Sequence, residues 1–262
     1  MIPRAYITEW RAEAPWQTDA QVEQDLVISR ALVEIYLDPY LKDHLGFRGG
    51  TALHKLYLKP PVRYSEDIDF IQLQAGPIGP LFDSLKDRLG FLGEPIRRQK
   101  DRNNLLIFRF ESEIPPVTPL RLKVEINCRE HFAVHGIRKF PYEVKSSWFR
   151  GISELSTFTL EELLGSKMRA LYQRSRGRDL FDLWYALEEK TVNIKEVIEC
   201  FYRFMAVTDA KVSRKEFTEN LKQKMTNRSS LADTNDLLRS DIQYDPIIAF
   251  ESIMENLISK LD

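Results

Sequence analysis

The sequence predicts an α+β fold in which a mixed, mostly antiparallel sheet with accompanying helices is followed by a helical C-terminal part. Three short runs between residues 68 and 127 alternate apolar and polar side chains and are rich in β-formers. After about Phe158 the apolar residues recur at helical spacing to the end of the chain. We therefore expect two domains, residues 1–150 and 151–262.

The elements of the first part alternate between helix and strand signals. An apolar stripe from Asp19 onwards predicts a long helix, and the segments TALHKLY and GPLFDSLKDRLGF predict two more. IDFIQL, LLIFRFE and LRLKVEIN are strand-like, and the turn-forming IPPVTP separates the last two. The predicted helices cover residues 19–41, 51–57 and 79–91, and the predicted strands cover residues 68–73, 105–111 and 120–127.

The second part begins with a capping box from Thr159 to Glu162, which predicts a helix over TLEELLGSKMRALYQR. RDLFDLWYALEEK predicts a second helix, entered after Gly177, and NIKEVIECFYRFMAV predicts a third. The last thirty or so residues have the pattern of two or three more helices.

The composition is that of an ordinary globular protein, with 43% hydrophobic and 29% charged residues among 262. The formal net charge of −1 gives no overall attraction to nucleic acid or to an anionic membrane, so a polyanion site must be a local patch. Two cysteines are too few for a disulfide framework and favour a cytoplasmic protein. No apolar run has the length of a membrane span, and we expect no membrane partner.

Two carboxylates lie on one face of the first predicted strand, because the side chains of Asp67 and Asp69 are two residues apart. Neighbouring carboxylates repel unless a cation lies between them, either a lysine or a metal such as Mg²⁺ or Mn²⁺. Glu125 is on the polar face of strand 120–127. If the two strands pair, three carboxylates converge as a two-metal site for phosphoryl transfer requires. The alternatives are a solvated strand edge and, for Glu125, a cross-strand pair with a lysine.

A glycine-containing turn precedes these carboxylates. Gly49 and Gly50 allow close approach of a ligand to the backbone, and Thr51 adds a hydroxyl at the beginning of a helix, where an anion is favoured. The alternative is a tight turn with a threonine cap.

The combination of Gly50-Thr51 with Asp67-Ile68-Asp69 resembles the signature of the DNA polymerase β-type nucleotidyltransferase superfamily. The longer text RGGTALHKLY…RYSEDIDF is similar to the AbiEii/AbiGii toxin family of type IV toxin–antitoxin and abortive-infection systems. The resemblance implies a polymerase β-like nucleotidyltransferase domain followed by a helical domain that completes the active-site cleft. It also implies metal binding by Asp67, Asp69 and Glu125. The nucleotide contacts that it implies come from Gly49, Gly50, Thr51, Arg63 and Ser65.

The segment LEELLGSKMRALYQRSRGRDLFDLW resembles the family's downstream motif, in which a helix carries a lysine and the next helix begins Arg-Asp-x-x-Asp. The resemblance implies that Lys167 contacts nucleotide phosphates and that Asp182, with Asp179, completes the catalytic set. Ser166 departs from the family, which usually has glutamate there. From the residues alone, Lys167 also fits a solvated helix lysine, and the aspartates fit the first turn of a helix.

Two basic clusters are candidates for phosphate contacts with a nucleic acid, with solvated arginines as the alternative. One is Arg174, Arg176 and Arg178, and the other is Arg97, Arg98, Lys100 and Arg102.

The resemblance implies a Mg²⁺-dependent enzyme that transfers NMP from an NTP to an acceptor hydroxyl and releases pyrophosphate. Relatives in the family modify the 3′ end of tRNA, so tRNA or another RNA is the implied acceptor. A cognate antitoxin that acts without a stable complex is also implied. The alternatives are a nucleotidyltransferase acting on a small molecule or protein, and a catalytically silent NTP-binding module.

Overall fold

The computed structural model describes residues 2–100, 103–227 and 231–262. It divides the chain into two compact units, Met1–Phe158 and Thr159–Asp262. The sequence had placed this boundary between residues 150 and 151, at the beginning of strand β7 (Arg150–Thr157). Because β7 pairs with β1 on one side and β6 on the other, the strand belongs to the sheet, and the first unit continues to Phe158.

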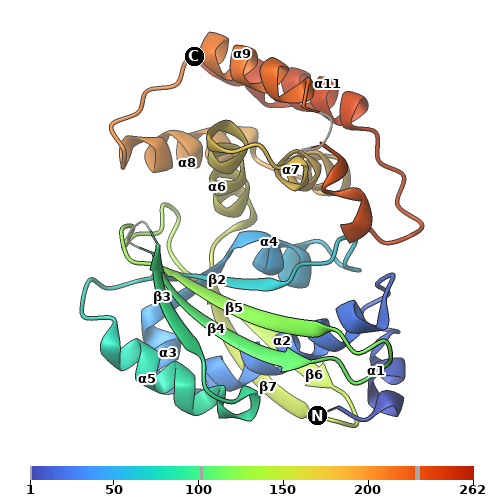
Figure 1. The fold of residues 1–262 in the computed structure, drawn as a ribbon. Coiled ribbons are helices and arrows are strands. Elements are labelled where there is room, and N and C mark those ends of the chain that lie inside the picture. The colour runs from blue at the N-terminus through green and yellow to red at the C-terminus, as the bar shows by residue number, and fades with distance from the viewer. Residues whose placement is uncertain (1, 101–102, 228–230) are drawn as a thin grey trace. The chain divides into compact units, whose positions relative to one another are not determined.

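The first unit is built on a mixed sheet with the strand order β3–β4–β5–β2–β1–β7–β6 in the described residues (Figure 1). The β2–β5 and β1–β7 pairs are parallel, and the other pairs are antiparallel. The predicted α+β class with a mostly antiparallel sheet is confirmed. The strands are β1 (Leu45–Arg48), β2 (Asp67–Gln72), β3 (Ile96–Lys100), β4 (Asn103–Glu111), β5 (Pro119–Asn127), β6 (Arg138–Lys145) and β7 (Arg150–Thr157).

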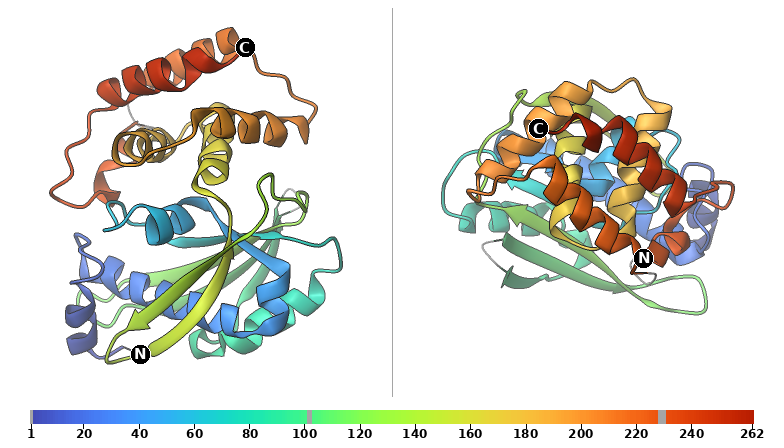
Figure 2. Two further views of the ribbon diagram at one scale, coloured as in Figure 1. Left: turned by 180° about the vertical axis from the view of Figure 1, so that it is seen from behind. Right: turned by 90° about the horizontal axis from the view of Figure 1, so that it is seen from above.

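One face of this sheet is covered by helices. Helix α2 (Asp19–Leu37) begins with a capping box at Thr18 and packs on β5, β6 and β7, as the rear view in Figure 2 shows. The predicted helix over residues 19–41 is interrupted because Asp38 caps a separate helix, α3 (Pro39–His44). Two further helices of this unit are α1 (Arg4–Trp10) and α5 (Gly79–Arg88).

Side-chain alternation separates the core from the polar face. On β2 and β5, Ile68, Phe70, Val124 and Ile126 are at most 1% exposed and face the helices. The odd-numbered residues of both strands therefore lie on the opposite face of the sheet. This face carries the predicted carboxylates.

Several helices and strands were not predicted from the sequence, or were predicted with other bounds. β1 has only four residues, and β3, with the sequence IRRQK, shows no apolar alternation. In β6 and β7 the alternation of apolar and polar side chains is weak. The first three residues of each strand are exposed or half-buried, so they need not be apolar. The helix predicted over residues 51–57 begins earlier, as α4 (Gly49–Ala52), and continues as a π-helical turn over Leu53–Tyr57.

The second unit is helical in its described residues, as predicted. Helix α6 packs on α7, α8 and α9, and α11 packs on α7. Gly165 makes the contact of α6 with α8 close, because a Cβ there would lie 2.5 Å from the Cβ of Cys200. The helices are α6 (Leu160–Gln173), α7 (Gly177–Glu189), α8 (Ile194–Ala206), α9 (Arg214–Met225) and α11 (Pro246–Asn256).

In the part of the chain that the structure describes, no helix combines the length and the apolar character needed to cross a membrane.

Candidate active site

Three carboxylates lie next to one another on the polar face of strands β2 and β5. The parallel register places Asp69 beside Glu125 and Asp67 beside Lys123. Neighbouring strands are about 4.8 Å apart, so these side chains are within reach of one another. The predicted convergence of the three carboxylates required β2 to pair with β5, and the two strands do pair.

Lys123, which the sequence analysis did not single out, lies between two of the carboxylates. Its Nζ is 2.8 Å from Oδ2 of Asp67 and 3.4 Å from Oε2 of Glu125. Burial alone would lower the pKa of Lys123, but the carboxylates, with Asp67 the strongest, raise it above its usual value. The sequence LRLKVEIN could have identified Lys123, because it is two residues from Glu125 and therefore on the same face of the strand.

The surroundings of Asp69 disfavour its ionised form. Burial, followed by the like charges of Asp67 and Glu125, raises the pKa of its carboxyl group above the ordinary value. Lys123 and Arg48 act in the opposite direction without cancelling this shift. The ionised form of Asp69 would therefore gain from an additional cation.

Polar groups surround the carboxylates on the neighbouring strands. Arg48 lies opposite Asp69 in the β1–β2 register, and its Nη1 donates to Oε2 of Glu130 at 2.9 Å. Nδ2 of Asn103 donates to Oε1 of Glu125 at 2.6 Å. Arg48, Asn103 and Glu130 come from separate segments, so spacing along the sequence gave no signal for them.

The glycine turn lies directly against the Asp69 carboxylate. Gly49 has a φ of +79°, and a Cβ at this position would lie 2.3 Å from Oδ2 of Asp69. Glycine is thus required both by the left-handed backbone and by the contact. The predicted proximity of the turn to the Asp-x-Asp strand is present.

Thr51, Ser65 and Arg63 fix the segment that leads into β2. The buried Thr51 hydroxyl donates to the carbonyl of Asp67 and lies 2.8 Å from the hydroxyl of Ser65. Arg63 is 2% exposed and donates from Nη1 to the carbonyl of Tyr64 at 2.9 Å. These contacts position the carboxylates, and nucleotide contacts from the three residues stay a prediction.

The donor chemistry fits a divalent cation. Oδ1 of Asp67 is buried and has no hydrogen-bond partner among the described residues, and oxygen donors are those that Mg²⁺ prefers. An ammonium already occupies the space between Asp67 and Glu125. In the described residues, no three His, Cys, Asp or Glu side chains are grouped closely enough to hold a metal as they stand. In this arrangement the Lys123 ammonium lies where a cation shared by Asp67 and Glu125 would bind.

A second cluster lies within the helical unit, between α6 and α7. Nζ of Lys167 is 3.1 Å from Oδ1 of Asp179 and 2.7 Å from Oδ2 of Asp182, and both aspartates are fully buried. Arg174 donates to both carboxylate oxygens of Asp179 at 2.7 and 2.9 Å. The structure therefore brings together Lys167, Asp179, Asp182 and Arg174.

Asp179 is held ionised by this cluster. Burial favours its neutral form, but Lys167 and then Arg174 outweigh burial and lower the pKa of the carboxyl group below its ordinary value. Arg178 is half-buried and is not bonded to the cluster.

The two predicted basic clusters are only partly available for phosphates. Arg97 pairs with Asp83 at 2.8 Å, whereas Arg98 is exposed. Arg176 lies 3.8 Å from Asp233. Arg102 lies outside the described residues.

Solved structures that share this fold include two nucleotidyltransferases. MenT4, a nucleotidyltransferase toxin from Mycobacterium tuberculosis H37Rv, matches with a TM-score of 0.69 and 17% identity, over 100% of this chain and 91% of MenT4. A candidate nucleotidyltransferase from H. pylori matches with a TM-score of 0.50 and 17% identity, over 90% of this chain and 92% of that protein. No curated protein sequence matches the chain.

The family comparison covers both units. The model described as "Nucleotidyl transferase AbiEii toxin, Type IV TA system" matches residues 30–256, which include the glycine turn, the carboxylates and the Lys167 cluster. The chain is therefore a member of the AbiEii family of nucleotidyltransferase toxins.

Proposed function

We propose that this nucleotidyltransferase transfers NMP from an NTP to a hydroxyl of an RNA, with the 3′ end of tRNA as the first acceptor to test. The observation that carries the proposal is the direct contact between the Gly49 turn and the Asp69 carboxylate. A triphosphate bound at the turn would have its α-phosphate next to Asp67, Asp69 and Glu125.

In the proposed reaction, the acceptor oxygen attacks the α-phosphorus of the NTP. The bond from this phosphorus to the bridging oxygen of the β-phosphate breaks, and pyrophosphate leaves with the electron pair. The hydroxyl proton passes to solvent. The reaction depends mainly on position and on neutralisation of charge, and a preorganised polar site supplies both.

Asp67, Asp69 and Glu125 would hold Mg²⁺ or Mn²⁺ when Lys123 moves aside. The metal would supply neutralisation of the charge that develops on the phosphoryl oxygens. Gly49 leaves space for the Asp69 carboxylate, and Thr51 and Ser65 fix the backbone before Asp67. Their part is to orient the carboxylates and the NTP.

Lys167 is the proposed contact of the helical unit with the nucleotide phosphates. Asp179 and Asp182 hold its ammonium group in one place, which favours a defined contact over a mobile one. In this proposal Asp182 and Asp179 are positioning residues.

The family implies an antitoxin partner. We propose that it acts without a stable complex and that the reaction takes place in the cytoplasm, where NTPs and tRNA are present. Two cysteines, Cys128 and Cys200, are too few for a disulfide framework, and this favours a reducing compartment.

The experiment is incubation of the purified protein with Mg²⁺, total RNA and each labelled NTP in turn, followed by gel separation. We expect label at the 3′ end of tRNA from one or two of the NTPs. D69N should abolish it, whereas D87N, the same change at an exposed site on α5, should retain it.

Two results would contradict the proposal. Label on a protein or a small molecule, with none on RNA, would identify a different acceptor class. Binding of NTP without any labelled product would indicate a silent nucleotide-binding module.

A further inference from the structure

Two arginines face each other on the open side of the sheet. Arg109 of β4 and Arg121 of β5 are direct cross-strand neighbours, and both are exposed. Like charges directly opposite each other on a sheet are destabilising. Neither guanidinium forms an ion pair with a carboxylate of the described residues, so no direct ion pair offsets their repulsion.

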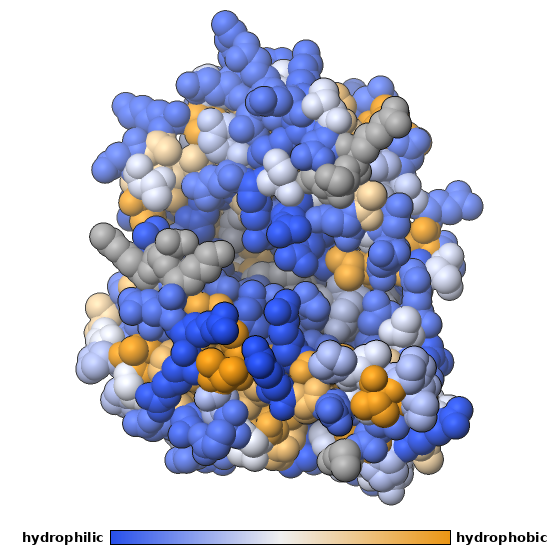
Figure 3. Space-filling view, in the orientation of Figure 1, coloured by the Kyte–Doolittle hydropathy of each residue, from blue (hydrophilic) through white to orange (hydrophobic). Residues whose placement is uncertain are grey.

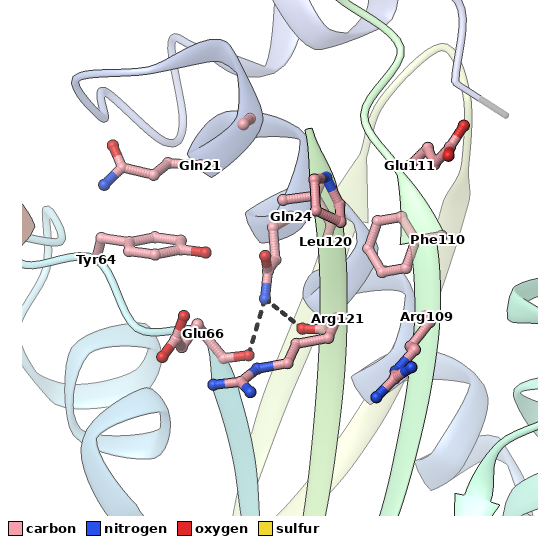
Figure 4. Close-up of a pocket in the computed structure, with 11 residues that line it drawn as sticks. Gln21, Gln24, Tyr64, Glu66, Arg109, Phe110, Glu111, Leu120 and Arg121 are labelled. Atoms are coloured by element: carbon pink, nitrogen blue, oxygen red, sulfur yellow. Dashed lines mark hydrogen bonds between the residues drawn. The ribbon is translucent and has the colours of Figure 1, made fainter. Parts of the chain in front are cut away.

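The arginines line a hollow of about 710 Å³ within the first unit. Figure 4 shows Arg109 and Arg121 coming from neighbouring strands, with Gln24 bridging the backbone carbonyls of Glu66 and Arg121 through bonds of 3.1 and 2.8 Å. Gln21 and Tyr64 add further polar groups. In the space-filling view, strongly hydrophilic side chains flank an apolar patch over β3–β5 (Figure 3).

This hollow adjoins the carboxylates. Arg121, Lys123 and Glu125 alternate along one face of β5, so Arg121 is about 13 Å from Glu125 along the strand. Glu66, which lines the hollow, directly precedes Asp67.

The order of the strands places the hollow on the β4–β5 side of the aspartates of β2. The glycine turn follows β1, whereas the arginines are on β4 and β5, with β2 and its aspartates in between. An NTP bound at the turn would therefore lie on the opposite side of the carboxylates from the arginine pair. The group that must reach the carboxylates from the β4–β5 side is the acceptor.

We infer that Arg109 and Arg121 bind a backbone phosphate of the acceptor RNA, next to the nucleotide whose terminal hydroxyl reacts. This inference rests on the proposed function, since it places the acceptor of that reaction. An RNA phosphate between the guanidinium groups removes their repulsion and fixes the distance of the chain end from Asp69. Glu66 and Glu111 also line the hollow and weaken the attraction, which suits a substrate that must leave after reaction.

The test compares R109Q/R121Q with R138Q/R150Q in the full-length protein. The control removes the same charge from two exposed arginines of β6 and β7. Binding of unfractionated tRNA is measured over a range of salt concentrations, and binding of ATP, GTP, CTP and UTP is measured separately by calorimetry.

We expect R109Q/R121Q to bind tRNA roughly tenfold more weakly and to reduce the slope of log affinity against log salt by about 0.7 per lost phosphate contact. NTP binding should not change, and the control should match the wild type. Weaker NTP binding with unchanged tRNA binding would assign the arginines to the triphosphate. Unchanged binding of both, or an equal loss in the control, would also overturn the inference.

R121E provides an independent readout, because it places opposite charges across the strand pair. We expect its melting temperature without RNA to rise while tRNA binding falls, which simple unfolding cannot produce. A lower melting temperature would contradict the repulsion on which the inference depends.

The inference and the proposed function fail separately. If the wild type labels tRNA but R109Q/R121Q does so with an unchanged KM for tRNA, only the inference is wrong. If the arginines are needed for tRNA binding but no nucleotide is transferred to tRNA, only the proposed reaction is wrong.

Discussion

At the scale of single residues, the site brings together carboxylates that repel one another when no ligand is bound. The half-buried Asp69 carboxylate lies beside two like charges, and burial followed by these charges raises its pKa, so its ionised form is disfavoured. Lys123 relieves Asp67 and Glu125 by direct ion pairs, whereas no ion pair links it to Asp69 in the described structure. Ionised Asp69 is therefore a net destabilising group when no ligand is bound.

We predict that D69N is more stable than the wild type at neutral pH in buffer with a chelator. Because folding raises the pKa of Asp69, its contribution to stability is complete below the unfolded pKa and is lost as pH rises through the folded pKa. The variant should gain roughly 0.5–1 kcal/mol near pH 8. Thermal unfolding from about pH 4 to pH 8 checks this, and a wild type that stays more stable at pH 8 would contradict it.

Gly49 allows a second prediction, with Gly93 as its control. Both have a φ near +80°, but a Cβ at Gly93 meets nothing within 4 Å, whereas one at Gly49 meets the Asp69 carboxylate. G93A should lose about 1–3 kcal/mol for the backbone conformation alone, because φ 80° with ψ −165° is a region that is nearly restricted to glycine. G49A should lose more, and denaturant unfolding should show this excess shrinking in the D69A background. Equal losses in G49A and G93A would refute the contact.

The sequence was sufficient for part of this site. Alternation placed Asp67, Asp69 and Glu125 on polar faces, and the pairing of β2 with β5 joined them. Lys123 was not singled out as part of the site. The alternative for Glu125 expected a lysine on the opposite strand, whereas Lys123 is on the same strand as Glu125. Arg48 and Glu130 are 82 residues apart, and only the folded chain brings them together.

At the scale of elements, the Lys167 cluster holds α6 and α7 together. Two fully buried aspartates face one lysine that is 7% exposed, with Arg174 as the second cation. Removal of one partner from a buried ion pair leaves an uncompensated charge in the interior. The cluster is therefore structural as well as a candidate for phosphate binding.

We predict that K167M destabilises the protein by about 3–5 kcal/mol, because Asp182 loses its ion pair inside the helical unit. K195M, on the exposed side of α8, should change stability by less than about 0.5 kcal/mol. Urea unfolding measures both. Wild-type stability in K167M would show that the cluster adds nothing to the packing of α6 and α7. Activity of K167M must be compared at equal folded fraction.

Elements with a strong periodic pattern were predictable from the sequence, and elements fixed by pairing were not. Helices α6, α7 and α8 each have an apolar stripe at helical spacing in the sequence. These stripes are buried where α6 packs on α7 and α8. β3 forms a hairpin with β4, and β6 forms one with β7, which also pairs with the distant β1. The exposed residues of β3, β6 and β7 leave no periodic signal in the sequence.

At the scale of the whole molecule, the limit of the first unit is decided by β7. The strand lies inside the sheet, between β1 and β6, although it comes last in the unit. Its residues are tied to early segments of the chain: Tyr36 donates to the carbonyl of Ser156 at 3.0 Å, and Thr157 donates to the carbonyl of Phe47 at 2.8 Å. Leu155 is fully buried.

The difference between the predicted and observed boundaries can be tested with two fragments, residues 1–158 and 1–150. The shorter fragment lacks β7, so β6 loses its partner and β1 acquires an open edge, which favours aggregation. We expect 1–158 to be soluble and to unfold cooperatively in circular dichroism, and 1–150 to aggregate or to melt without a cooperative transition. The same cooperative transition in both fragments would mean that β7 is dispensable, and the boundary between residues 150 and 151 would then hold.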